Sequence, residues 1–168
     1  MAKKTLDKPS RSAPKPESSV SITKQMIDEI NGLDNLKDYG IRTLVEHAEA
    51  FGPFLRNRRL ETNQIRKFLD AINRLKAQLA GDTEDTEAEL QSEEKKKQRD
   101  AELFAKIESD IVLLKPKLAY AAARQDAAEP LSDVMSAAIN KTYTLQDFER
   151  LVQMIESIIA YHKAAGGR

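Results

Sequence analysis

The chain of 168 residues contains no cysteine and no tryptophan, and aromatic residues make up only 5% of it. Without cysteine, the chain can form neither disulfides nor thiolate metal sites, which favours a reducing compartment. No apolar run approaches the ~20 residues that a membrane-spanning helix needs, and no apolar segment near the N-terminus resembles a secretory signal. We therefore predict a cytoplasmic protein without a membrane partner.

Sequence motifs of catalysis and cofactor binding are also missing. There is no glycine-rich phosphate loop, no His-x-x-x-His helix and no Gly-x-Ser-x-Gly nucleophile turn. The two histidines lie far apart: His47 is expected at or partly below the surface, and His162 packed in or beside a core stripe. The acidic pair Glu84 and Asp85 lies in a low-complexity segment where nothing would desolvate it. The sequence therefore predicts a binding or scaffold protein rather than an enzyme, without metal or cofactor.

Residues that favour helices are abundant. Ala, Leu, Glu, Lys and Gln dominate, and hydrophobic residues make up 40% of the chain and charged residues 32%. We find no convincing strand pattern, internal repeat or sustained heptad, whereas apolar residues recur at steps of three and four, the period of an amphipathic helix. The sequence predicts an all-α protein, a single-domain helical bundle of about six helices.

Two segments differ from this pattern. Residues 1–20 are rich in Lys, Ser and Pro, and they hold too few apolar side chains to offset the entropy of ordering, which predicts a disordered basic tail. Residues 82–94 carry seven acidic residues and no basic one. Because almost no apolar stripe runs through residues 81–100, we predict a charged insertion there that is exposed or poorly ordered. The bundle domain is placed at residues 21–168.

Capping residues indicate where the helices begin and end. A short helix is expected near residues 23–31, and a second one over about 34–55, whose glycines and proline should leave its end ragged. Thr62 is the expected N-cap of a third helix, which Gly81 stops. Another helix is expected to start near residue 86.

Two further caps indicate the C-terminal helices. Pro130 suits the first turn of one of them. Thr144 suits the N-cap of the last helix, and Asp147, three residues later, completes a pair of the capping-box type. The sequence therefore predicts two helices after residue 129, the last of which ends at the C-terminal glycines.

One stretch, residues 113–124, combines an apolar face with a cationic one. Lys117, Tyr120 and Arg124 fall at steps of three and four, on a different side from the apolar residues. Pro116 has no amide donor, so it predicts either a kink or a new helix that begins there. Arg124 can be a ligand contact, or a buried structural arginine that pairs with an acidic residue.

The net charge of zero hides another basic block at residues 54–76, which we call the first basic block because it precedes the second one at residues 113–124. Residues 54–76 hold seven basic residues and two acidic ones, and three of the arginines precede the helix expected from Thr62, near its positive end. This block predicts an anion-binding surface. The alternative is that Asp70 pairs with Lys67 and Arg74 along the helix, in weak surface ion pairs.

Three blocks of the sequence follow one another in an order that is typical of one family. The blocks are residues 60–75, with Thr62, Gln64, Ile65, Arg66, Lys67, Phe68 and Asn73-Arg74-Leu75; residues 113–124; and Ile158-Ile159-Ala160-Tyr161-His162-Lys163, followed by glycines.

In these blocks the chain resembles the small helical subunit of type III-A CRISPR–Cas effector complexes, over about residues 33–168. Ala123 stands where that family often has glycine. The resemblance implies an all-α, non-catalytic subunit that stacks in several copies along the crRNA–target RNA duplex. It implies crRNA, target RNA, the crRNA-holding backbone subunits, the large polymerase-type subunit and further copies of itself as partners. No cofactor is implied.

The resemblance also implies that basic residues of the matched blocks line an RNA channel. The alternative is a helical protein–protein adaptor without nucleic-acid binding, in which the cations of the first block are tied up in surface ion pairs. The two hypotheses differ in whether both basic blocks lie on one surface. The residues expected to contact RNA are Arg58, Arg59, Arg66, Lys67, Arg74, Lys115, Lys117, Tyr120, Arg124 and Lys163.

Overall fold

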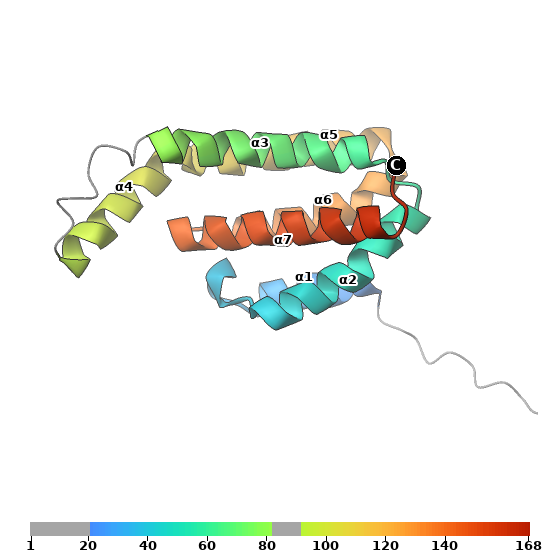
Figure 1. Ribbon diagram of the computed structural model, residues 1–168, viewed down its shortest axis with the longest axis horizontal. Coiled ribbons are helices and arrows are strands. Elements are labelled where there is room, and N and C mark those ends of the chain that lie inside the picture. Colours follow the sequence, from blue (N-terminus) through green and yellow to red (C-terminus); the bar gives the residue numbers. More distant parts are fainter. Residues whose placement is uncertain (1–20, 82–91) are drawn as a thin grey trace, which may run out of the picture.

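The computed structural model describes residues 21–81 and 92–168 (Figure 1). The predicted tail at 1–20 and the helix start expected near residue 86 lie outside this part of the chain. Within it all regular elements are helices and none is a strand, which confirms the predicted all-α bundle. The elements are α1 (Ile22–Asn31), the 3₁₀ helix η1 (Leu36–Asp38), α2 (Ile41–Asn57), α3 (Thr62–Gly81), α4 (Glu93–Val112), α5 (Leu114–Arg124), the 3₁₀ helix η2 (Asp126–Ala128), α6 (Glu129–Asn140) and α7 (Leu145–Ala164).

The last helix, α7, is the centre of the bundle. Figure 1 shows α7 and α6 in a middle tier, with α3 and α5 on one side and α1 and α2 on the other. Apolar residues of α7 are buried on several sides, because it packs against α2 and α3 and also contacts α4. Its fully buried side chains include Leu151, Met154, Ile155 and Ile158. The position of α3, and thus of the first basic block, is set by this packing.

Helix α2 differs from the prediction at both ends. It begins only at Ile41, because η1 and the extended residue Tyr39 precede it, and it runs unbroken through Gly52 and Pro53 to Asn57. The expected ragged end is therefore wrong. Gly52 lies where α2 crosses α7: a Cβ atom at this position would be 2.5 Å from the backbone nitrogen of His162. The glycine allows the two backbones to approach closely.

A Schellman motif ends α2. The N–H of Leu60 donates to the carbonyl of Leu55 (3.1 Å), and the N–H of Arg59 donates to that of Arg56 (2.9 Å). Arg59 has a φ of 65°, so an arginine occupies the left-handed position that usually holds glycine. This turn sends the chain from α2 into α3.

The sequence predicts Thr62 as the N-cap of α3, but Thr62 is instead the first residue of this helix. Its side chain is buried, and its Oγ1 lies 3.5 Å from Nδ1 of His162. Nε2 of His162 lies 2.8 Å from the carbonyl oxygen of Leu60, which can only accept, so Nε2 carries the proton. His162 is fully buried, which confirms its prediction as a packed residue.

A new helix begins two residues before Pro116 and not at Pro116 itself. Helix α4 ends at Val112 and α5 begins at Leu114, so Pro116 is the third residue of a new helix. The missing N–H costs nothing there, because the first four N–H groups of a helix have no partner within it. Residues 93–98 of α4 are helical and exposed. None of the described helices combines the length and apolarity needed to cross a membrane.

The capping pair of α7 is formed as predicted. The N–H of Asp147 donates to Oγ1 of Thr144 (3.2 Å), and the N–H of Thr144 donates to Oδ2 of Asp147 (3.0 Å). The other oxygen, Oδ1, accepts from the backbone N–H of Lys37 in η1 (2.8 Å). A local cap is therefore also a long-range link between the N-terminal part of the chain and α7.

Candidate nucleic-acid interface

The apolar faces of α3 and α5 form the floor of a groove between these helices. Phe68 and Leu75 of α3 are buried, as are Leu114 and Leu118 of α5. Each helix also carries basic residues three or four positions from its apolar ones, so that they lie at the edge of the buried face. Packing the two apolar faces together brings both sets of cations to the rim.

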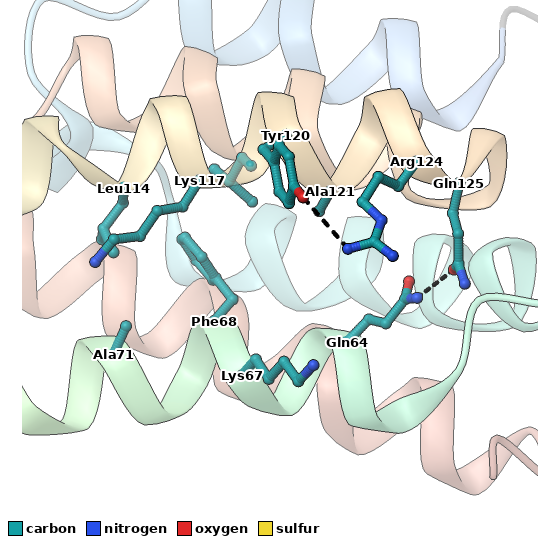
Figure 2. Close-up of a pocket in the computed structure, with 11 residues that line it drawn as sticks. Gln64, Lys67, Phe68, Ala71, Leu114, Lys117, Tyr120, Ala121, Arg124 and Gln125 are labelled. Carbon is teal, nitrogen blue, oxygen red and sulfur yellow. Dashed lines mark hydrogen bonds between the residues drawn. The ribbon is translucent and has the colours of Figure 1, made fainter.

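Two adjoining hollows follow this rim. The first has a volume of about 530 Å³ and holds Lys67, Lys117 and Arg124 (Figure 2). The second has a volume of about 510 Å³, holds Arg74, and shares Lys117 with the first. We call the two hollows together the α3–α5 groove. Its lining residues are Gln64, Lys67, Phe68, Ala71, Arg74, Leu75, Gln78, Asp110, Leu113, Leu114, Pro116, Lys117, Leu118, Tyr120, Ala121, Arg124 and Gln125.

The four cations of the groove have no acidic partner in the described part of the chain. The ion pairs found there are Lys24–Asp28 and Lys76–Glu156, and neither is in the groove. Asp70 pairs with neither Lys67 nor Arg74 among the described residues, which does not fit the surface-pair alternative. The cations are therefore available to an external anion.

Arg124 lies at the rim with Tyr120. Its guanidinium carbon is 5.6 Å from the centroid of the Tyr120 ring, and its Nη1 donates to the Tyr120 hydroxyl (3.3 Å). Both side chains are exposed, and Tyr120 keeps 64% of its surface accessible. The alternative that Arg124 is a buried structural arginine is therefore wrong. Its charge is presented to solvent beside an aromatic ring.

Two glutamines close one end of the first hollow. Nε2 of Gln64 donates to Oε1 of Gln125, which links α3 to the end of α5 (Figure 2). Oε1 of Gln64 is buried and has no hydrogen-bond partner among the described residues. Gln64, Gln125 and Phe68 were not among the predicted contact residues. The spacing of three between Gln64 and Lys67, which puts both on one helix face, was the signal that could have indicated Gln64.

The other predicted contact residues lie outside the groove. Nζ of Lys115 donates to Oδ1 of Asn140 at the end of α6 (2.6 Å), and Arg58 donates to the carbonyl of Asp126 (3.1 Å). Arg66 and Lys163 are exposed but line neither hollow. The cations of the second basic block therefore lie in two places. Lys117 and Arg124 line the groove, whereas Lys115 contacts the end of α6.

Substitution of Arg59 tests the cost of its left-handed backbone conformation. We expect Arg59→Gly to raise the free energy of unfolding by about 0.5 kcal/mol, since relief of the left-handed conformation outweighs the greater entropy of glycine in the unfolded chain. Chemical denaturation measures this change. Arg58→Gly, one residue earlier and outside the left-handed region, is the control and should be destabilising. A loss of stability in Arg59→Gly would show that the arginine side chain contributes more than its backbone strain costs.

Tyr39 and His47 form a pair of titratable side chains outside the groove. Nδ1 of His47 lies 2.6 Å from the hydroxyl of Tyr39, and His47 is half-buried, in agreement with its prediction. Burial, together with the charge of Glu29, raises the pKa of Tyr39, so the phenol stays protonated beside the histidine. Among the described residues, no group of three acidic, histidine or cysteine side chains is placed to hold a metal ion.

The fold and the groove define the class of this protein: a small all-α bundle with an exposed cationic groove between two of its helices. The family model Csm2 Type III-A matches residues 38–168, which is 131 of the 168 residues and includes the whole groove. The chain therefore belongs to the Csm2 Type III-A family and is a small subunit of a type III-A CRISPR effector complex. The comparisons with curated proteins and with solved structures gave no match.

Proposed function

We propose that this subunit is a non-catalytic scaffold whose α3–α5 groove holds the sugar–phosphate backbone of RNA. One observation carries the proposal: Lys67 and Arg74 of α3 and two cations of α5 line one groove without an acidic partner in the described chain. Two helices that are far apart in the sequence thus contribute to one cationic surface. Such a surface is better suited to binding a polyanion than to the protein–protein contacts of an adaptor.

The physics of a guide complex favours backbone contacts. The sequence of a guide RNA and its target varies, so a constant protein surface can hold them only through phosphates and sugars. Lysine and arginine provide these contacts through charge-assisted hydrogen bonds to phosphate oxygens. The groove fits this requirement, because its cations project from helices that are fixed by a shared apolar floor.

The proposed partners follow from family membership. They are the crRNA and the target RNA, the backbone subunits that hold the crRNA, the large polymerase-type subunit, and further copies of this chain. A single copy offers four cations in its groove, which is a modest binding site. Several copies along one duplex would act as a multivalent site, and their combined affinity would far exceed that of one copy.

Binding of RNA to the isolated subunit tests this proposal. We expect a labelled single-stranded RNA of ~40 nucleotides to bind with a salt dependence that reports its phosphate contacts, about 0.7 in logarithmic slope for each. Lys117→Glu/Arg124→Glu should weaken binding about tenfold at low salt and lower the slope by about 1.4, because two contacts are lost. Fluorescence anisotropy over a salt series measures both quantities.

A matched control reverses two charges elsewhere. Lys96→Glu/Lys97→Glu changes the net charge by the same amount, and both lysines are exposed in the part of α4 that projects from the bundle (Figure 1). This protein should bind RNA almost as the wild type does. If both double variants weaken binding equally, the effect is one of net charge and not of the groove. If the wild type does not bind at low salt, the adaptor alternative is favoured.

A further inference from the structure

The first hollow of the α3–α5 groove is more than a cationic surface. Its floor is apolar, formed by Phe68, Leu114 and Leu118, with Ala71 and Ala121 on its walls. Its volume of about 530 Å³ lies within the range of small-molecule pockets. The floor holds α3 and α5 together, but the part of it that faces the hollow offers nothing to phosphate oxygens, which require polar partners. The hollow therefore suits a ligand with an apolar body and an anionic neighbour.

We propose that this hollow binds one unpaired nucleobase of the RNA, while Lys67 and Lys117 hold the phosphates on either side of it. This inference rests on the proposed function and names a subsite within it. The base has to be unpaired, since a paired base within a duplex has both faces covered by its neighbours and its edge covered by its partner. A base outside a stack would exchange its exposure to water for contact with the floor.

The rim of the hollow carries groups that stack. The Tyr120 ring is exposed, and the planar guanidinium of Arg124 lies beside it, 5.6 Å from the ring centroid. Rings and guanidinium planes both stack on nucleobases of any sequence, because every base has a π face. Figure 2 shows the two side chains on the α5 side of the hollow, across from Phe68 and Lys67 of α3.

An unpartnered acceptor lies at the end of the same hollow. Oε1 of Gln64 is buried without a hydrogen bond among the described residues, and Gln64 lines the same hollow as Arg124 (Figure 2). A buried acceptor without a donor is costly. If the Gln64 side chain rotates toward the hollow, a ring or exocyclic N–H of a base would satisfy it. Because an amide offers both an acceptor and donors, it tolerates bases of different kinds.

The test fills the hollow without changing any charge. Ala121→Leu places a larger side chain on the wall, and Ala119→Leu makes the same change at an exposed position of α5 that does not line the hollow. Each protein is titrated by fluorescence anisotropy against an end-labelled oligouridine and against an oligomer of equal length with an abasic central tract. Circular dichroism confirms the helicity of each variant, and Ala71→Leu, on the α3 wall, repeats the test independently.

We expect the wild type to bind the oligouridine at least about fivefold more tightly than the abasic oligomer, since a stacked base contributes at least that much. Ala121→Leu and Ala71→Leu should lower the affinity for the oligouridine to that for the abasic oligomer, and Ala119→Leu should retain the preference. A preference that persists in both filled variants, or is absent from the wild type, overturns the subsite but leaves salt-dependent RNA binding intact. Failure of the wild type to bind either oligomer at low salt overturns the proposed function as well.

Discussion

Replacement of Gly52 by alanine is expected to lower the free energy of unfolding by about 2 kcal/mol. The added Cβ would lie 2.5 Å from the backbone nitrogen of His162 and 2.7 Å from the carbonyl carbon of Tyr161. These are backbone atoms of α7 that cannot rotate away, so α2 and α7 would have to separate. The better helix propensity of alanine offsets only part of this cost, about 1 kcal/mol. Urea denaturation with linear extrapolation measures the change.

Gly81 is the matched control for this substitution. A Cβ atom there would meet no other atom within 4 Å, and Gly81 is also a helical residue, the last of α3. Gly81→Ala should therefore raise the stability by a few tenths of a kcal/mol (roughly 0.3), from helix propensity alone. If Gly52→Ala were as stable as Gly81→Ala, the close crossing of α2 and α7 would not exist in solution.

Replacement of Asp147 by alanine is expected to cost about 3 kcal/mol, which combines the loss of the Asp147 half of the capping box with part-buried donors left unpaired. The carboxylate is fully buried and accepts four hydrogen bonds. The backbone N–H groups of Lys37, Tyr143 and Thr144 lie 2.8, 3.0 and 3.0 Å from its oxygens, and the Thr144 hydroxyl lies 2.9 Å away. Alanine would leave these donors without an acceptor and remove the hydrogen bond between η1 and Asp147 of α7.

Two measurements identify this mechanism. Chemical denaturation should show the loss in Asp147→Ala and almost none in Asp133→Ala, since Asp133 is an exposed residue of α6. Hydrogen exchange at the Lys37 amide should become faster in Asp147→Ala, because that amide loses its acceptor. Unchanged protection at Lys37 would contradict the long-range role of Asp147, even if the stability fell.

These two positions matter to the groove because they hold α7 in place. Gly52 sets the distance between α2 and α7, and Asp147 fixes the start of α7 against η1. Helix α7 in turn supports α3, which carries Lys67 and Arg74. Substitutions in the core can therefore weaken RNA binding indirectly, so each groove variant needs a stability measurement beside its binding curve.

The sequence by itself determined the class of fold and much of its local structure. The 3.6-residue period of apolar side chains identified the helices, because each helix must bury one face. The capping pair of Thr144 and Asp147 was predictable because both residues lie within one turn and bind each other's backbone. The order of three blocks indicated the family, which the match over residues 38–168 shows.

Tertiary structure alone decided which cations share a surface. Helical spacing put Lys117 and Arg124 on one face of α5, but it could not show that this face lies opposite Lys67 of α3. The same spacing could not tell that Lys115 bonds to Asn140. The close crossing of α2 and α7 at Gly52 could likewise not be predicted from helical spacing. From the sequence alone, this glycine predicts a ragged helix end. The period of a helix fixes relations within one element, whereas the packing of buried faces fixes those between elements.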